Sequence, residues 1–260
     1  MGRALDALLD TAPPALRDRA DAPRLIAGSQ GVRRPSSRLL GAGAGPAAAA
    51  FLRSLAAALR GAGAADAIPL ASLPPGDRRA VLDLLGEGEV RIEIAPGPVL
   101  AVESVMPGVW RIRDAAGGPV RIEAGEVPAV LREALARCPA APPAGGRPDT
   151  AFAEEVARLA AGFAPGAAGR VLAPDPAAMP ALAAWLGEGP VRATVLGYGG
   201  VEVSATRSRH LWRLRHHDAR GGAARDTIEV GDIPEALRAA PQDMADSAER
   251  LEEVVKAFAR

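Results

Sequence analysis

Two motifs of this chain recur in the same order, and this internal repetition constrains the fold more than any other feature of the sequence. LGEGEV at 85–90 returns as LGEGPV at 186–191, and IEAGEVP at 122–128 returns as IEVGDIP at 228–234. The two copies are offset by 101 residues at the first motif and by 106 at the last proline, so small hairpin insertions account for the drift. The pattern predicts an internal duplication.

Between the two motifs of each copy, hydrophobic residues recur with the period of two that is typical of strands. Val90, Ile92 and Ile94 alternate with charged residues, which predicts a strand with one solvated face. Trp110 and Trp212 fall at equivalent positions, each followed by arginine. Further strands are expected at 99–106, 109–114 and 119–125 in the first copy, and at 191–198, 199–207, 210–218 and 225–232 in the second, with Gly-Gly hairpin turns at 117–118 and 221–222.

Helices are expected before and after each run of strands, because proline stands near their starts and glycine near their ends. The expected helices cover 46–60, 75–85, 128–137, 150–163 and 177–186, with one opening at Ile233-Pro234 and a last one from about Asp243. The predicted fold class is therefore α+β, with two tandem helix–antiparallel β-meander–helix repeats and a helical N-terminal extension. We expect the extension at 1–70, the first repeat at 71–138, a Pro/Gly linker at 139–149 and the second repeat at 150–258.

The Gly-x-Gly of LGEGxV resembles a nucleotide-binding loop but has the opposite polarity. A phosphate loop leaves a strand and enters a helix N-terminus, where the helix dipole favours anions. Here the motif follows a helix, so we expect Gly86 and Gly187 to end helices with positive φ. The sequence therefore does not predict nucleotide binding.

Charge and cysteine content exclude several classes of function. Lys+Arg and Asp+Glu both number 31, so the chain has no net field that would attract nucleic acid or a membrane surface. The single cysteine, Cys138, allows neither an intramolecular disulfide nor a multi-thiolate metal site. No apolar run is long enough to span a membrane and the first residues do not read as a signal peptide, so we expect a cytoplasmic protein.

All three histidines fall in one predicted strand region, and alternation places His210 and His216 on one face and His217 on the other. This pair could bind a metal, but surface histidines on a solvated sheet face are the interpretation we favour. No nucleophile accompanies them. We therefore expect no metal, no cofactor and no enzymatic activity.

Four arginines of odd parity, Arg207, Arg209, Arg213 and Arg215, predict a basic stripe around Trp212. The stripe could hold an acidic or extended peptide, or it could be a solvated sheet face. The acidic C-terminal helix could also cover it. Tyr198, between glycines, indicates either an exposed binding feature or a plain hairpin turn.

The segments LGEGxV, GVWR, GYG, IEVGDIP and DSAERL occur here in order, and over residues 80–258 the chain resembles the HupH/HyaF family of hydrogenase expression/formation proteins. The resemblance implies a non-enzymatic chaperone of [NiFe]-hydrogenase maturation. Its expected partners are the iron–sulfur small subunit precursor, bound before assembly and export, and other maturation factors, with a homo-oligomer also possible.

Two other functions stay open: a small-molecule or metal-binding module with its site between the two repeats, and a structural subunit of the mature enzyme. For the chaperone we expect exposed strand edges to pair with an extended client segment. The side chains expected to bind a partner are Tyr198, Arg207, Arg209, Trp212 and Arg213 in the second copy, and Trp110, Arg111 and Glu103 in the first.

Overall fold

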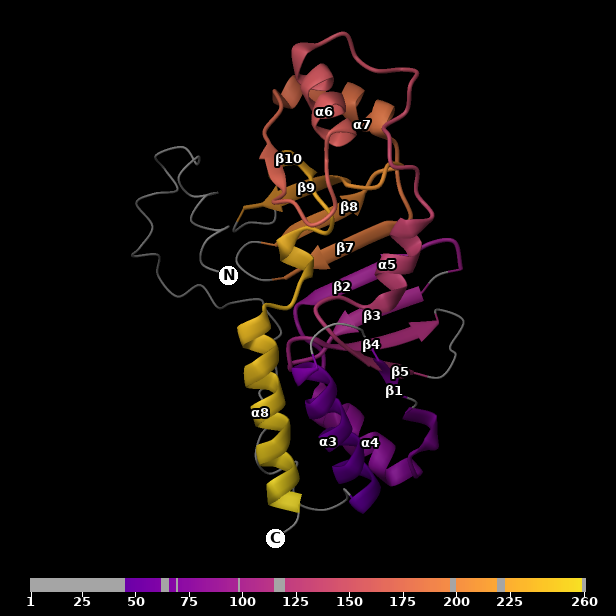
Figure 1. Ribbon diagram of the computed structural model, residues 1–260, viewed down its shortest axis with the longest axis vertical. Helices are drawn as coiled ribbons and strands as arrows, with labels where there is room; N and C mark the ends of the chain where they lie inside the picture. The colour runs from indigo at the N-terminus through magenta and orange to yellow at the C-terminus, as the bar shows by residue number, and fades with distance from the viewer. Residues whose placement is uncertain are drawn as a thin grey trace, which may run out of the picture. The chain divides into compact units, whose positions relative to one another are not determined.

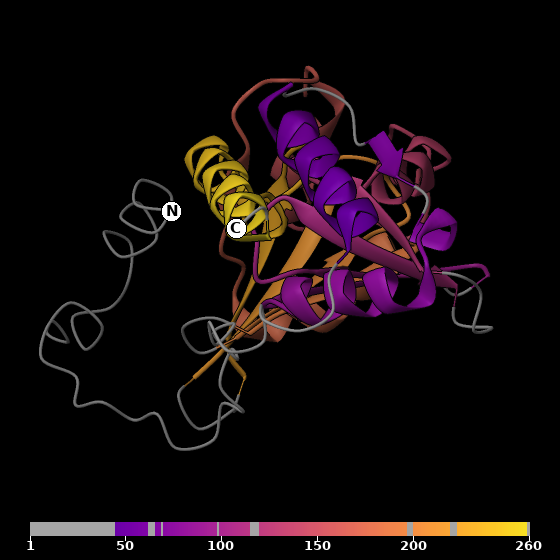
Figure 2. The same cartoon turned by 90° about the horizontal axis from the view of Figure 1, so that it is seen from below.

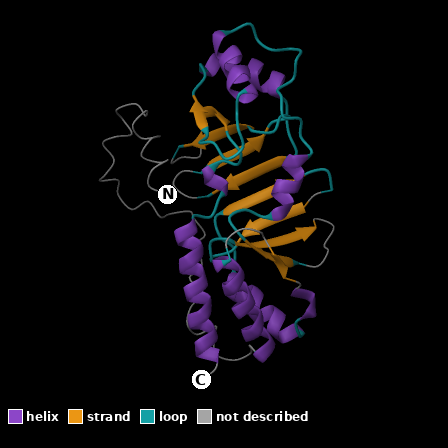
Figure 3. Cartoon of the chain, viewed as in Figure 1, coloured by secondary structure: helices purple, strands orange, loops and turns teal. Residues whose placement is uncertain are grey.

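A single antiparallel sheet of ten strands organises the part of the chain that the structure describes (Figures 1 and 3). The computed structural model describes residues 45–61, 66–68, 70–97, 99–114, 120–196, 200–218 and 223–258. The strand order is β1-β5-β4-β3-β2-β7-β8-β9-β10-β6. The strands are β1 (Asp66–Ile68), β2 (Val90–Ile94), β3 (Val99–Glu103), β4 (Val109–Asp114), β5 (Arg121–Ala124), β6 (Arg170–Leu172), β7 (Val191–Val195), β8 (Val201–Ala205), β9 (Leu211–His217) and β10 (Ala223–Val230).

The centre of this sheet is the antiparallel pairing of β2 with β7. Ile92 lies opposite Ala193, and the pairing extends over all five residues of each strand. Main-chain bonds continue it at both ends, from Ala95 N to Pro190 O at 2.8 Å and from Leu196 N to Glu89 O at 3.0 Å. The two meanders therefore share one continuous sheet, and the strand order runs outward from this junction in the same way on both sides.

One face of the sheet is apolar along its whole centre, because the alternation of the sequence places one residue in two there. Ile92, Trp110, Ala193 and Trp212 belong to one buried cluster. Helix α5 (Ala129–Ala136) crosses this face over β2 and β7, and the 3-10 turn η5 (Glu235–Leu237) also packs on it (Figure 1). We call it the apolar face.

The described helices cover the opposite face at its two ends and not over its middle. At one end α3 (Pro46–Arg60), the 3-10 turn η3 (Leu70–Ser72), α4 (Pro75–Leu85) and α8 (Pro241–Phe258) form a core with Val109 and Ile122. At the other end α6 (Ala151–Ala161) and α7 (Met179–Leu186), with the 3-10 turn η4 (Pro176–Ala178) before it, pack on Leu211 and Ile228. Figure 2 views the first end and shows α8 alongside α3.

Both LGEG segments end helices with left-handed glycines, as expected: φ is 52° at Gly86 and 65° at Gly187. The second glycine of each segment has a different reason. A Cβ on Gly88 would lie 2.4 Å from the carbonyl oxygen of Ser104, and one on Gly189 would lie 2.0 Å from that of Thr206. The first glycine of the motif therefore ends a helix, and the second lets the backbone pass close to a neighbouring turn. These two roles explain both glycines without a bound nucleotide.

The expected helices at 46–60 and 75–85 are confirmed with the same bounds, and all eight expected strands are present. A helix does open after Ile233-Pro234, as expected, but it is a 3-10 helix of three residues, η5, and a separate helix, α8, starts at Pro241. The sequence did not predict β1 and β6, which form the two edges of the sheet. The Gly-Gly turns at 117–118 and 221–222 and residues 1–44 of the expected extension lie outside the described residues.

The expected division at 70 and 71 between extension and first repeat stays a prediction. Helix α3 and strand β1 precede that position, yet α3 belongs to the core that contains Ile122, and β1 pairs with β5. The described chain from residue 45 onward belongs to one unit, in which the described part of the predicted extension, α3 and β1, packs with the sheet.

Candidate functional site

The two tryptophans expected at a partner site are buried in the core on the apolar face. Trp110 is 0% and Trp212 is 1% exposed. Each indole N–H donates to the backbone of the segment that follows the next strand, Trp110 to Gly125 O at 2.9 Å and Trp212 to Asp232 O at 3.0 Å. Burial leaves neither ring available to touch a partner directly, and their role in the described structure is to fix the IEAGEVP and IEVGDIP segments against the sheet.

The predicted basic stripe does not form as one surface. Arg207 and Arg209 lie in the turn before β9, where His210 has a positive φ of 68° that changes the phase of the alternation. Arg209 donates to Ala136 O and, at 3.1 Å, to Cys138 O, which ties this turn to the end of α5. The guanidinium of Arg207 fills the space beside Gly187. Only Arg213 and Arg215 remain as neighbours on one sheet face.

Glu103 lies at the end of β3 and accepts a hydrogen bond from Gly108 N at 3.1 Å. Burial raises its pKa to about 7, and the negative charges of Asp243 and Glu89 add to this, while the Gly108 bond opposes it. A second carboxyl, Glu229 of β10, also has its pKa raised to about 7, mainly by burial. Tyr198, the remaining residue expected in the site, lies outside the described residues.

The middle of the second sheet face, between the two groups of helices, is polar. Every second residue of seven neighbouring strands points there, and six of these strands contribute charged side chains, mostly arginine. We call it the arginine face. Its charged members are Arg91, Glu93, Arg111, Arg113, Arg192, Glu202, Arg213, Arg215, His217 and Asp226.

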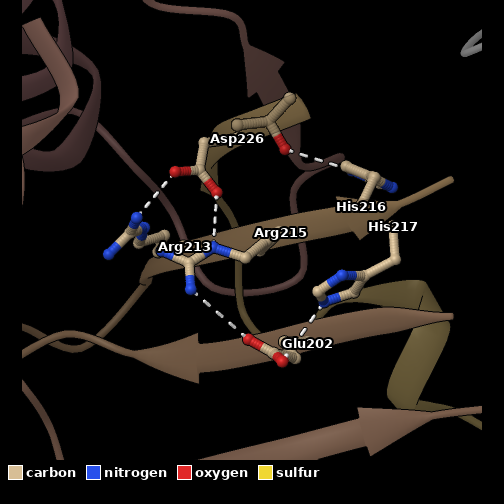
Figure 4. Close-up of polar contacts among 7 residues, drawn as sticks. Glu202, Arg213, Arg215, His216, His217 and Asp226 are labelled. Atoms are coloured by element: carbon tan, nitrogen blue, oxygen red, sulfur yellow. Dashed lines mark hydrogen bonds and ion pairs between the residues drawn. The ribbon is translucent and has the colours of Figure 1, made fainter. Parts of the chain in front are cut away.

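Side chains of the second half of this face form a continuous chain of polar contacts (Figure 4). Asp226 of β10 accepts from Arg213 at 2.6 Å and from Arg215 Nε at 3.2 Å. Arg215 also lies 3.7 Å from Glu202 of β8, which in turn lies 3.2 Å from His217 Nε2. Burial alone would raise the pKa of Asp226, but the hydrogen bonds from Arg213 and Arg215 lower it below its usual value.

A shallow hollow of about 250 Å³ opens on this half of the arginine face. Its walls are charged or polar: Glu188, Arg192, Glu202, Ser204, Arg213 and Arg215. Arg192 pairs with Glu188, so each arginine of the hollow has a carboxylate partner. Guanidinium groups in such an arrangement recognise carboxylates by paired hydrogen bonds, whereas a nucleophile with an adjacent base is not among these six residues.

The three histidines do not converge. His210 Nδ1 lies 3.0 Å from Asp232 Oδ1, and its ring contacts Phe163 with centroids 4.9 Å apart. His216 lies on the apolar side near Thr227, at 3.4 Å, and burial and the positive charge of Arg225 lower its pKa. His217 lies on the arginine face. Within the described ranges no three His, Cys, Asp or Glu side chains are grouped so that they could hold a metal ion.

The acidic C-terminal helix does not cover the basic residues of β9. Its apolar side, including Met244 and Leu251, packs into the core with α3, and Glu252 pairs with Arg60. The strand edges expected to bind a client are also limited, because β2 and β7 pair with each other and leave β1 and β6 at the edges, with three residues each. The site that the structure offers is therefore the arginine face. None of the described helices has the length and apolar character needed to cross a bilayer.

Comparison with known proteins gives consistent results. Residues 171–258 match the family described as "HupH hydrogenase expression protein, C-terminal conserved region". The chain is 35% identical over 204 residues to the hydrogenase expression/formation protein HupH of Rhodobacter capsulatus, covering 73% of this chain and 72% of that protein. It is 34% identical to HupH of Rhizobium leguminosarum bv. viciae, covering 73% of both chains, and 33% identical to the hydrogenase-1 operon protein HyaF of Escherichia coli K12, covering 72% of both.

Proposed function

Since this chain belongs to the HupH/HyaF family of hydrogenase expression/formation proteins, we propose that it acts in hydrogenase maturation by binding the iron–sulfur small subunit precursor before assembly and export. The names of its relatives support the maturation role, and the similarity extends over nearly three quarters of the chain. The expected cytoplasmic location belongs to this proposal, because the precursor is available there before export.

The observation that carries a binding role is the arginine face. It is a broad sheet surface whose charges come from six strands, and helices rise at its two ends rather than over its middle. Such a surface suits a polypeptide partner, since many spaced charged side chains can contact a long segment at once. The alternative of a small-molecule site between the halves has less support, because continuous main-chain pairing of β2 with β7 closes that junction.

We also infer that the two halves are tandem repeats. The same strand order on both sides of the β2–β7 junction supports this, as do equivalent hydrogen bonds. Gly88 N donates to Glu103 O at 2.7 Å, and Gly189 N donates to Ala205 O at 2.9 Å. Ser104 and Thr206 each form the same hydroxyl-to-backbone turn with the residue two positions later. Helices α3 and α6, which precede each half, end at Gly61 and Gly162, also 101 residues apart.

A tagged pull-down from cells that express the hydrogenase operon tests the proposed function, with bound proteins identified by mass spectrometry. We expect the small subunit precursor, with its export signal intact and without the large subunit. Recovery of the assembled enzyme in stable stoichiometry would instead indicate a structural subunit. Absence of both subunits would contradict the proposal.

A further inference from the structure

Corresponding arginines on the two halves of the arginine face have different surroundings. Arg213 and Arg215 follow Trp212 in β9, and Arg111 and Arg113 follow Trp110 in β4. Both pairs point to the same face of the sheet, as their cross-strand partners show. Arg213 and Arg215 are neutralised by carboxylates of the same chain. Arg111 and Arg113 are not neutralised to the same extent.

The register explains the difference. Arg215 lies between Glu202 of β8 and Asp226 of β10, its two cross-strand neighbours. Arg113 instead faces Leu100 of β3, and on its other side Val120 lies next to it. The carboxylates that neutralise the second half therefore have apolar counterparts in the first.

Arg113 is exposed, and it makes no ion pair within the residues that the structure describes. Arg111 is held in place, because it donates to Gly86 O at 2.7 Å, and its one ion-pair partner, Glu87, is 3.8 Å away. The Glu87 side chain is itself 57% exposed, so this pair is a weak one. Both arginines line the same notch, and of the two only Arg111 has an ion-pair partner among the described residues.

The floor beneath these groups is apolar. Val102 is 6% and Leu100 is 7% exposed. Glu87, Val102, Arg111, Arg113 and Val120 surround a notch of about 10 Å³, which we call the arginine notch. It is too small to enclose a small molecule, so recognition here takes place on the open surface.

We propose that the arginine notch binds an acidic segment of a polypeptide partner, with a carboxylate of that segment taking the place that Asp226 occupies beside Arg215 in the second half. The apolar floor favours the pairing, since it excludes water from one side of the guanidinium groups. Nucleic acid is a poorer fit, because the remaining arginines of the face are already paired with carboxylates. The inference deepens the proposed function by naming the chemistry of the client segment.

Fluorescence anisotropy of labelled octaglutamate, with octalysine as the charge control, tests the notch on the full chain. We expect Arg113→Glu to weaken octaglutamate binding by roughly 10-fold or more at low salt, since a charge-assisted contact is lost and repulsion is added. The matched control is Arg79→Glu on α4, whose side chain is 84% exposed and is not among the residues that line the notch; we expect a change of less than about 2-fold. Equal effects of the two variants would overturn the proposal.

The second half provides a gain-of-function test. The double variant Glu202→Gln/Asp226→Asn removes the negative charges beside Arg213 and Arg215 and keeps side chains of nearly the same size at positions 202 and 226. We expect octaglutamate stoichiometry to rise from one to two per chain, as measured by titration calorimetry. An unchanged stoichiometry in a variant with native circular dichroism would contradict the charge argument, and if the double variant does not fold, the Arg113→Glu comparison decides alone.

The same variants separate this inference from the proposed function. If wild-type protein captures the small subunit precursor and Arg113→Glu captures it equally well, the function stands and the notch proposal fails. If the wild type binds octaglutamate through Arg113 but captures no precursor, the notch stands and the proposed client is wrong.

Discussion

Ile92 of β2 lies directly opposite Ala193 of β7, and the two residues are separated by the same 101 positions that separate the LGEG segments. If the two halves are repeats, as we propose, residues at equivalent positions meet at the centre of the sheet. Such a pairing has the geometry of an isologous dimer interface within one chain.

Substitution at this central pair tests how much the junction stabilises the fold. Ile92 is 0% exposed, so we expect Ile92→Ala to lower the free energy of unfolding by about 2–5 kcal/mol through lost burial and the resulting cavity. Its neighbour Arg91 is exposed on the other face, and Arg91→Ala should change the value by less than about 0.5 kcal/mol. Urea unfolding followed by circular dichroism measures both, and similar losses for the two variants would refute the assignment of faces.

Gly189→Ala should be severely destabilising. The added Cβ would lie 2.0 Å from the Thr206 carbonyl oxygen, which belongs to the backbone and has little freedom to move. We expect a loss above about 3 kcal/mol, or failure to fold. Gly76→Ala is the matched control, because a Cβ in this helical position meets nothing within 4 Å and alanine favours the helix by about 0.5–1 kcal/mol. Thermal melts of both variants give the comparison.

Asp226→Asn should lower stability at neutral pH by about 1–3 kcal/mol, since Arg213 and Arg215 lose their shared charged acceptor. The folded-state pKa of Asp226 is depressed, so its contribution is present above the unfolded-state pKa and is lost as pH falls through the folded-state value. The difference in unfolding free energy between wild type and Asp226→Asn should therefore narrow as the pH falls below the ordinary aspartate pKa of about 4. A gap independent of pH would show that packing, not charge, is the cause.

Glu103→Gln should have the opposite pH dependence. The folded-state pKa of Glu103 is raised to about 7, so wild-type stability is greatest below the unfolded-state pKa and falls as pH rises through 7. Glutamine keeps an acceptor for Gly108 N and carries no charge. We expect the variant to be more stable than wild type at pH 8.5, by about 1–2 kcal/mol, and nearly equal to it at pH 4.

The exposed Glu93→Gln serves as the control for Glu103→Gln, with urea midpoints measured at both pH values. Glu229, with its pKa also near 7, should retain part of the alkaline sensitivity in the Glu103→Gln variant, and the double variant Glu103→Gln/Glu229→Gln should remove more of it. A Glu103→Gln variant less stable than wild type at pH 8.5 would contradict the burial argument.

Local signals in the sequence predicted most of the fold. Prolines at the first turns and glycines at the ends fixed the bounds of α3 and α4, and alternation predicted the strands and the buried side of Trp110. Strands β1 and β6 have only three residues each and are defined by pairing with β5 and β10. Pairing across such distances along the chain leaves no periodic signal in so short a segment.

The candidate site was less accessible to prediction from sequence. The alternation of strand residues predicted that Arg207 and Arg209 lie on the same face as Arg213. That prediction failed because nothing in the sequence indicates the left-handed conformation of His210. The proximity of Asp226 to Arg213 and Arg215 depends on the register of β10, including the irregularity between Ala223 and Arg225. The contrast between Arg113 and Arg215 became visible only once the residues opposite each were known.

The β2–β7 junction also bears on self-association. A strand with unpaired backbone groups can template the aggregation of another chain, and five-residue strands such as β2 and β7 would be suited to this if each half stood alone. Pairing with each other leaves three-residue strands as the only open positions of the described sheet. If the chain binds a precursor as we propose, this arrangement lets it offer a wide binding surface without becoming a nucleus for the precipitation of that precursor or of itself.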